Sequence, residues 1–150
     1  MDKETKAQFK AFVELYGLNK DDFQALHKMF IVKRRGIEKI QRGLSARVTY
    51  EVVPEFTDVA LDKYCIKAIA KTPTGSYVET YGESTRKNCR IEYMIAICEK
   101  RALARAILKL SSLYELPVHS EDEISDWRRG LAAWYAWRVF TNSWLANTVI

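Results

Sequence analysis

The stretch between residues 88 and 114 limits the fold of this chain more than any other. Asn88 is a predicted N-cap, the periodicity predicts a helix to about Tyr114, and Pro117 prevents much further extension. One broad face is apolar and carries Ile91, Ile95, Cys98, Ala102, Ala106, Leu110 and Leu113. A second side is also apolar through Met94, Ile97 and Leu108. A helix that is apolar on two sides is usually sandwiched between layers or subunits, so we expect it at the centre of the fold. We further expect its second apolar side to form the contact between subunits.

The same helix carries a stripe of cations along one edge of its broad face. The stripe consists of Arg90, Arg101, Arg105 and Lys109. Arginines between two layers need carboxylates, carbonyls or the phosphates of a ligand as partners. The stripe therefore predicts either ion pairs, with Glu92, Glu99 or acids of a neighbouring sheet, or an edge that contacts phosphate.

Three stretches before the helix alternate apolar and polar residues with the period of β-strands. Residues 47–53 form one predicted strand, which Pro54 ends. Residues 64–72 and 76–84 flank the turn signal "TPTG" and form a predicted hairpin. We therefore expect an α+β fold, in which a three-stranded antiparallel β-meander with a hairpin precedes the long packed helix as a β-β-β-α core.

Two helices are predicted before these strands. In "KETKAQFKAFVELYG" the apolar residues recur at helical spacing, and Gly17 is a natural C-terminal stop. In "NKDDFQALHKMF", residues 19–30, Asn19 is a predicted N-cap and two aspartates follow in the first turn. The predicted buried face of this second helix consists of Phe23, Leu26 and Phe30.

A strongly basic segment follows the second predicted helix. Its six cations are Lys33, Arg34, Arg35, Lys39, Arg42 and Arg47, and Glu38 is the only acid among them. Such a run is often a solvated face. The alternative is a segment that contacts phosphates, in which Gly36 and Gly43 let the backbone come close to a ligand.

The end of the sequence differs abruptly in composition. Residues 125–150 contain all four tryptophans: Trp127, Trp134, Trp137 and Trp144. Their spacing predicts an amphipathic C-terminal helix that packs on the domain or on a neighbouring subunit, with a base-stacking platform as the alternative. The chain thus divides into one domain over residues 1–124, with its core at about 30–120, and the Trp-rich C-terminal segment.

The bulk composition excludes several classes of protein. A chain of 150 residues suits one domain, and its 24 Lys and Arg against 19 Asp and Glu make it basic. It has no P-loop motif, no nucleophile elbow and no Cys or His cluster at metal spacing, so we expect no enzyme activity, no cofactor and no metal. Three cysteines without a CxxC pair, no apolar leader and no membrane-length apolar run predict a cytoplasmic protein.

The order of elements and one short motif resemble a known family. "KRAL" at residues 100–103 follows the predicted hairpin "YCIKAIAKTPTGSYVETYGES", and "GLSARVTYEVV" resembles the strand before it. This arrangement resembles the single-strand DNA annealing proteins of recombinational repair, the eukaryotic Rad-type mediators and their phage Sak-like relatives. The resemblance covers roughly residues 30 to 120 and rests on the motif and the element order.

The resemblance implies an ATP-independent protein that binds and anneals single-stranded DNA in homologous recombination. Such proteins form homo-oligomeric rings or filaments and hold the DNA in a basic groove. By this carry-over Lys100 and Arg101 would face the phosphate backbone. The family's next basic position falls on Ala104, whereas this chain has Arg105 one residue later. The resemblance leaves open whether a phage exonuclease or a single-strand-binding protein is also a partner, and a phage-encoded chain would work in the host cytoplasm or nucleoid.

Two other functions remain open at this point. A β-β-β-α order also resembles a double-stranded-RNA-binding domain, in which a basic helix start contacts phosphates. "STRKNCR", with Arg86, Lys87 and Arg90, could form such a start. The other alternative is a non-enzymatic oligomeric scaffold, in which the basic residues are surface only.

Overall fold

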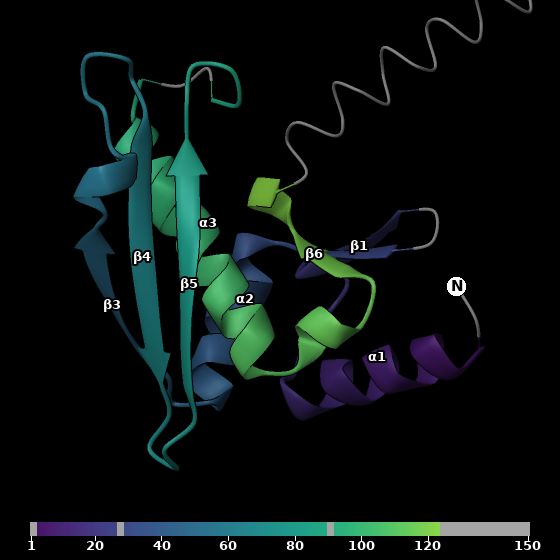
Figure 1. The fold of residues 1–150 in the computed structure, drawn as a ribbon. Coiled ribbons are helices and arrows are strands. Elements are labelled where there is room, and N and C mark those ends of the chain that lie inside the picture. Colours follow the sequence, from purple (N-terminus) through teal and green to yellow (C-terminus); the bar gives the residue numbers. More distant parts are fainter. Residues whose placement is uncertain (1–2, 27–28, 90–91, 124–150) are drawn as a thin grey trace, which may run out of the picture.

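Two three-stranded sheets and three α-helices make up the part of the chain that this computed structural model describes, residues 3–26, 29–89 and 92–123 (Figure 1). In chain order the elements are α1 (Lys3–Leu15), β1 (Phe23–Leu26), β2 (Met29–Val32), α2 (Arg34–Gly43), β3 (Arg47–Val52), β4 (Tyr64–Lys71), β5 (Tyr77–Ser84), α3 (Met94–Leu110) and β6 (Val118–Ser120). Short 3-10 helices lie at Pro54–Phe56 and Leu113–Glu115. The predicted α+β class is confirmed.

The larger sheet has the order β3-β4-β5 and is the predicted antiparallel meander. Arg47 pairs with Lys71, and Lys71 pairs with Tyr77, so one row of residues crosses all three strands. The β4–β5 turn contains Gly75 with a φ of 92°, a left-handed conformation that glycine adopts without strain. The β-β-β-α order is therefore present as β3-β4-β5-α3.

Small residues bring α3 close to one face of this sheet. Ala68 and Ala70 of β4 pack against Ala102 and Ala106 of α3, and all four are fully buried. At the closest point a Cβ on Gly82 would lie 2.0 Å from the backbone oxygen of Cys98. The alanines and the glycine thus set the distance between helix and sheet, because a larger side chain there would push the helix away.

The second sheet replaces the helix predicted over residues 19–30, and that prediction is wrong. β1 and β2 pair antiparallel, and β2 pairs in parallel with β6, which places Phe30 beside Val118. The spacing of Phe23 and Phe30 fits a helix, but both rings also pack on Phe9 of α1. Pairing with a distant strand decided the outcome, and local spacing could not reveal it.

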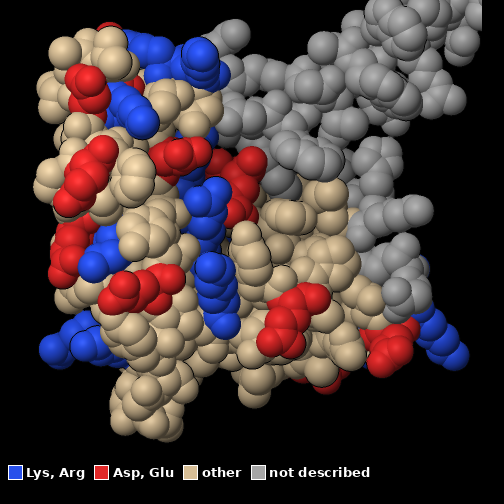
Figure 2. Space-filling model, in the orientation of Figure 1, with Lys and Arg blue, Asp and Glu red and all other residues tan. Residues whose placement is uncertain are grey.

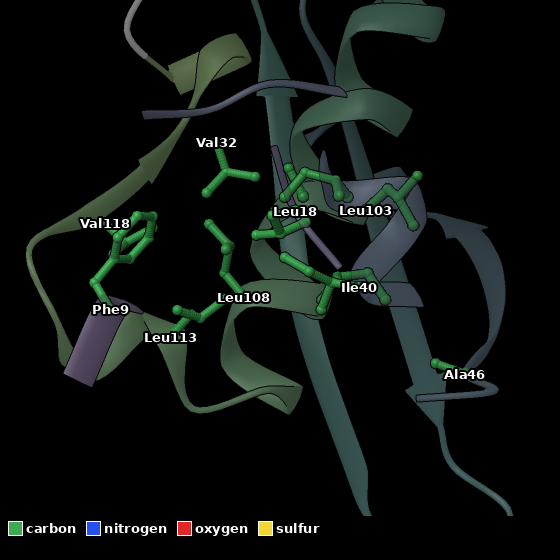
Figure 3. Close-up of a cluster of buried hydrophobic side chains, with 12 residues drawn as sticks. Phe9, Leu18, Val32, Ile40, Ala46, Leu103, Leu108, Leu113 and Val118 are labelled. Carbon is green, nitrogen blue, oxygen red and sulfur yellow. The ribbon is translucent and has the colours of Figure 1, made fainter. Parts of the chain in front are cut away.

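The main core lies on the side of α3 that faces away from the larger sheet (Figure 1). Figure 3 shows side chains from α1, β2, α2, α3 and β6 gathered there, among them Phe9, Val32, Leu108 and Val118. Leu108 has no exposed surface and Met94 is 3% exposed. The second apolar side of α3 is therefore covered largely by the chain itself, which corrects the expectation that this side forms the contact between subunits.

The helix α3 is shorter than predicted. Asn88 does not cap it, because its side-chain oxygen accepts a hydrogen bond from the backbone N–H of Thr85 in a separate turn. The helix starts at Met94 and ends at Leu110, before Ser112 in a left-handed conformation. The predictions for Arg90, for Ile91 and for a Trp-rich C-terminal helix fall on residues outside the described part of the chain.

Candidate nucleic-acid interface

The predicted cation stripe of α3 runs beside β5, an edge strand of the larger sheet. Arg101 donates to the carbonyl oxygen of Glu83 at 2.7 Å, and Arg105 donates to that of Tyr81 at 2.8 Å. Four helix residues thus correspond to two strand residues, since both advance by about 6–7 Å. Lys109, four residues further along the helix, is exposed, and its ammonium lies 5.6 Å from the centroid of the Tyr114 ring. The stripe consequently covers backbone groups that a sheet edge would otherwise leave without partners.

Arg101 is a structural residue in this arrangement. Its side chain is 6% exposed, and its guanidinium donates to the carbonyl oxygens of Glu83, Asn88 and Asp122. It thereby joins the end of β5, the turn before α3 and the segment after β6. The resemblance assigned this residue to the phosphate backbone, but here its donors are used within the fold. Arg101 therefore lies inside the fold and is not a surface contact.

Arg105 is also tied to its own chain. Its Nε lies 2.6 Å from a carboxylate oxygen of Glu123, and the other oxygen of Glu123 accepts the backbone N–H of Ser120. The arginine retains about a third of its surface and the glutamate about a tenth. The carboxylate that pairs with Arg105 belongs to Glu123, which follows β6. Neither Glu92 nor Glu99 is therefore its partner.

A buried carboxylate forms ion pairs with two cations of the basic segment that contains α2. Asp22 is fully buried, and it lies 2.6 Å from Lys39 and 3.3 Å from Arg35. Burial raises the pKa of Asp22, but hydrogen bonds from Lys39 and from the Asn19 N–H, with both neighbouring cations, lower it below its usual value. These two cations therefore stabilise the fold, and Arg34 pairs with Glu38 on the surface.

The glycines of this segment serve internal packing. A Cβ on Gly36 would lie 2.7 Å from the backbone oxygen of Asp22, and one on Gly43 would lie 2.8 Å from the ring of Tyr16. The expectation that they let a ligand approach the backbone is corrected, because the chain itself occupies both places.

The remaining predicted cations are spread over several surfaces. Arg86 pairs with Asp62 at 2.7 Å, and Lys87 is exposed beside it in the turn after β5. Lys100 and Arg34 lie near enough to Asp122 to act on its carboxyl, although burial is the larger effect and raises the pKa of Asp122. Lys33 precedes α2, Arg42 is exposed in its last turn, and Arg47 begins β3. Apart from Lys100 of α3, these cations therefore come from three separate parts of the described fold: the turn after β5, the region of α2, and the start of β3.

The open face of the larger sheet, opposite α3, holds a different set of candidate residues. Arg47, Lys71 and Tyr77 stand side by side across the three strands. The Lys71 ammonium lies 5.3 Å from the centroid of the Tyr77 ring, and about half of that ring residue is exposed. A cation next to an accessible aromatic ring can hold a phosphate while a base stacks on the ring. We call these three residues the Arg47–Lys71–Tyr77 row.

The rest of this face is electrically balanced. Lys67 lies 2.7 Å from Glu51 and 4.0 Å from Glu79. The hydrogen bond to Glu51, together with the charges of both acids, raises the pKa of Lys67. Figure 2 shows Lys and Arg side chains interleaved with Asp and Glu side chains on the side of the molecule that presents this face. Excess positive charge is therefore local to the Arg47–Lys71–Tyr77 row.

Lys71 and Tyr77 were absent from the set predicted from the sequence. Charge counting overlooked Lys71, because it stands as one of two lysines in an apolar strand. The signal that could have found both residues was the alternation of the hairpin: residues 65, 67, 69 and 71 share one face, and Tyr77 pairs with Lys71 across the turn.

The described residues contain no group of three or more His, Cys, Asp or Glu that could hold a metal ion. None of the helices within 3–26, 29–89 and 92–123 combines the length and the apolar character that crossing a membrane requires.

Comparisons with known proteins add no support to the resemblance noted in the sequence. No protein-family model matches the chain, and no curated protein and no solved structure matches it either. The likeness to annealing proteins therefore rests on the "KRAL" stretch and on the β-β-β-α order.

Proposed function

We propose that this chain binds single-stranded DNA and promotes annealing without ATP, as a homo-oligomer in homologous recombination. The observation that carries the proposal is the Arg47–Lys71–Tyr77 row, which combines two cations with an accessible ring on an open sheet face. Sequence-tolerant binding of single strands uses this combination of phosphate contacts and base stacking. The β3-β4-β5-α3 order is consistent with the family that the "KRAL" stretch suggests.

The proposed contact set differs from the one that the helix motif suggested. Lys109 and part of Arg105 remain accessible beside the β5 edge, and Lys71 and Tyr77 lie on the adjoining face. A strand of DNA that crosses this edge would meet cations from both elements. Subunit contacts would use surface other than the covered side of α3. The free edge of β3, where most residues are exposed, is the surface we propose.

Fluorescence anisotropy with a labelled single-stranded oligonucleotide tests the proposal. Binding should weaken as salt rises, because phosphate contacts release counterions. Tyr77→Ala should cost about 1–3 kcal/mol of binding free energy through lost stacking. Lys71→Ala should reduce the slope of the logarithm of the binding constant against the logarithm of salt concentration by about 1, which is the loss of one phosphate contact. Lys6→Ala is the matched control, because it removes an exposed cation of α1.

Two results would contradict the proposal. One is single-strand binding that is unchanged in both row variants, and the other is a wild-type chain that stays monomeric with and without the oligonucleotide. Mass photometry on the same preparations measures the second.

The double-stranded-RNA-binding alternative is favoured by one specific observation. α2 precedes β3, α3 follows β5, and the two helices contact each other, which gives the α-β-β-β-α order of that module. In this alternative, the contacts come from residues before α3, among which Lys87 is exposed. Lys87→Ala should then weaken binding of duplex RNA and leave single-strand binding intact, the reverse of Tyr77→Ala.

A further inference from the structure

An unusually apolar surface lies at the end of the larger sheet that is remote from the β4–β5 turn. The loop between β3 and β4 exposes Phe56, Val59 and Leu61, which are 58%, 69% and 72% accessible. A pocket of about 290 Å³ opens beside the loop and is lined by Phe56, Lys63, Tyr64, Cys65, Tyr81 and Glu83. Single exposed apolar residues are ordinary, but three in one loop, one of which lines a pocket, are typical of a docking surface.

This surface continues around Tyr64. A second pocket, of about 420 Å³, shares Tyr64 with the first and includes Tyr93 and Ile95 at the start of α3. Tyr93 is 75% and Ile95 is 56% exposed. The Arg86–Asp62 ion pair joins the turn after β5 to the β3–β4 loop, so both pockets belong to one end of the sheet. We call this area the Phe56–Tyr93 surface.

The described chain ends next to this surface. Arg101 contacts the carbonyls of both Glu83 and Asp122, and Arg105 contacts both the Tyr81 carbonyl and the Glu123 carboxylate. Tyr81 and Glu83 also line the first pocket. Two guanidinium groups therefore hold Asp122 and Glu123 beside β5, the strand that contributes Tyr81 and Glu83 to the first pocket.

The segment that begins there has the composition of an apolar occupant. Residues 124–150 contain every tryptophan of the chain, and Trp127 follows Glu123 by four residues. An extended chain of four residues spans at most about 14 Å, which is the longest reach of Trp127 from Glu123. Indole rings bury a large apolar area, which is what an accessible apolar pocket lacks.

We propose that residues 124–150 dock through their tryptophans on the Phe56–Tyr93 surface of the same chain. Arg101 and Arg105 act as the anchor that directs the segment toward the pockets. The proposal is independent of nucleic-acid binding, because the Arg47–Lys71–Tyr77 row lies at the opposite end of the sheet (Figure 1).

Intrinsic tryptophan fluorescence tests this docking, because all four tryptophans lie in the segment. In the folded 150-residue chain the emission should be blue-shifted and protected from acrylamide quenching relative to the urea-unfolded chain. Phe56→Glu and, separately, Val59→Glu should move the emission and the quenching toward the unfolded values. Both side chains are largely exposed, so circular dichroism should show an intact fold.

Leu15→Glu is the matched control. Leu15 is 71% exposed and lies on α1, on the other side of α3 from the sheet, so its replacement should leave the tryptophan signal unchanged. Solvent-like emission in the wild type, or emission that neither loop variant alters, would overturn the proposal. A blue shift that disappears on dilution would also overturn it, because the segment would then dock on a second copy.

Discussion

The two sheets of this protein reach their structures by different routes. β3, β4 and β5 are neighbours along the chain, and two of them have eight residues each. β1, β2 and β6 have only three or four residues, and β6 joins them from the far end of the domain. Pairing of distant segments costs more loop entropy than pairing of neighbours. The stability of the small sheet therefore depends on packing against the core around it. The large sheet forms by pairing of strands that are neighbours in the sequence.

The helix α3 serves the two sheets with different residues. Toward the large sheet it presents alanines that permit close approach, and toward the small sheet it presents Ile107 and Leu108, which fill the core. Arg101 then joins the end of β5 to the residues after β6. The difference teaches that one helix can be a spacer on one side and a core element on the other.

The largest effect is expected where helix and large sheet are closest. Gly82→Val should lower the free energy of unfolding by about 3–5 kcal/mol, because its Cβ would meet the backbone of Cys98 and that backbone cannot rotate away. Urea denaturation measures the change. Glu79→Val, on the open face of the same strand, is the control, and equal losses in the two variants would show that the helix does not set the spacing.

The next effect concerns the small sheet. Phe9 is 2% exposed and stacks on Phe30 with ring centroids 3.7 Å apart. Phe9→Ala should lower the free energy of unfolding by about 3–4 kcal/mol, because it leaves a cavity in the core. In hydrogen exchange, amides of β1, β2 and β6 should lose protection before those of β4 and β5. Uniform loss of protection would mean that the two sheets unfold as one unit and would break the comparison.

Loss of the link between the sheets should have a somewhat smaller effect. Arg101→Ala leaves three carbonyl oxygens without their donor, and we expect a loss of about 2–3 kcal/mol because water can reach some of them. The measurement is the urea midpoint, with Lys109→Ala as the exposed control on the same stripe. A variant that unfolds like the wild type would return Arg101 to the candidate ligand contacts.

Acid should act on the small-sheet side through Asp22. Its pKa is lowered in the folded protein, so its contribution to stability is complete above the unfolded value of about 3.9 and is lost as the pH falls through the folded pKa. The difference in urea midpoint between wild type and Asp22→Asn should therefore shrink below about pH 4. A difference that stays constant down to pH 2 would contradict the ion pairs with Lys39 and Arg35.

The smallest stability effect is expected on the open face of the large sheet. Tyr77→Ala changes a half-exposed residue, so its melting temperature should stay near that of the wild type while single-strand binding falls. A marked drop in melting temperature would assign Tyr77 to the structure of the sheet.

Local patterns in the sequence determined the large sheet and the first helix. Period-two alternation identified β3, β4 and β5, the "TPTG" turn identified their hairpin, and Gly17 marked the stop after α1. These features depend on residues close together in the chain, where turn chemistry and side-chain period act directly. The cation stripe of α3 was visible for the same reason.

Only the tertiary structure decided what those residues contact. Phe23 and Phe30 fit a helix and a hairpin equally well by spacing, and β6, almost ninety residues further along, selects the hairpin. The sequence left carboxylates, carbonyls and phosphates open as partners of Arg101, and the fold supplies carbonyls. The physical reason is the same in both cases: a side chain's period is local, but its partner comes from whatever segment the packing of the whole chain brings beside it.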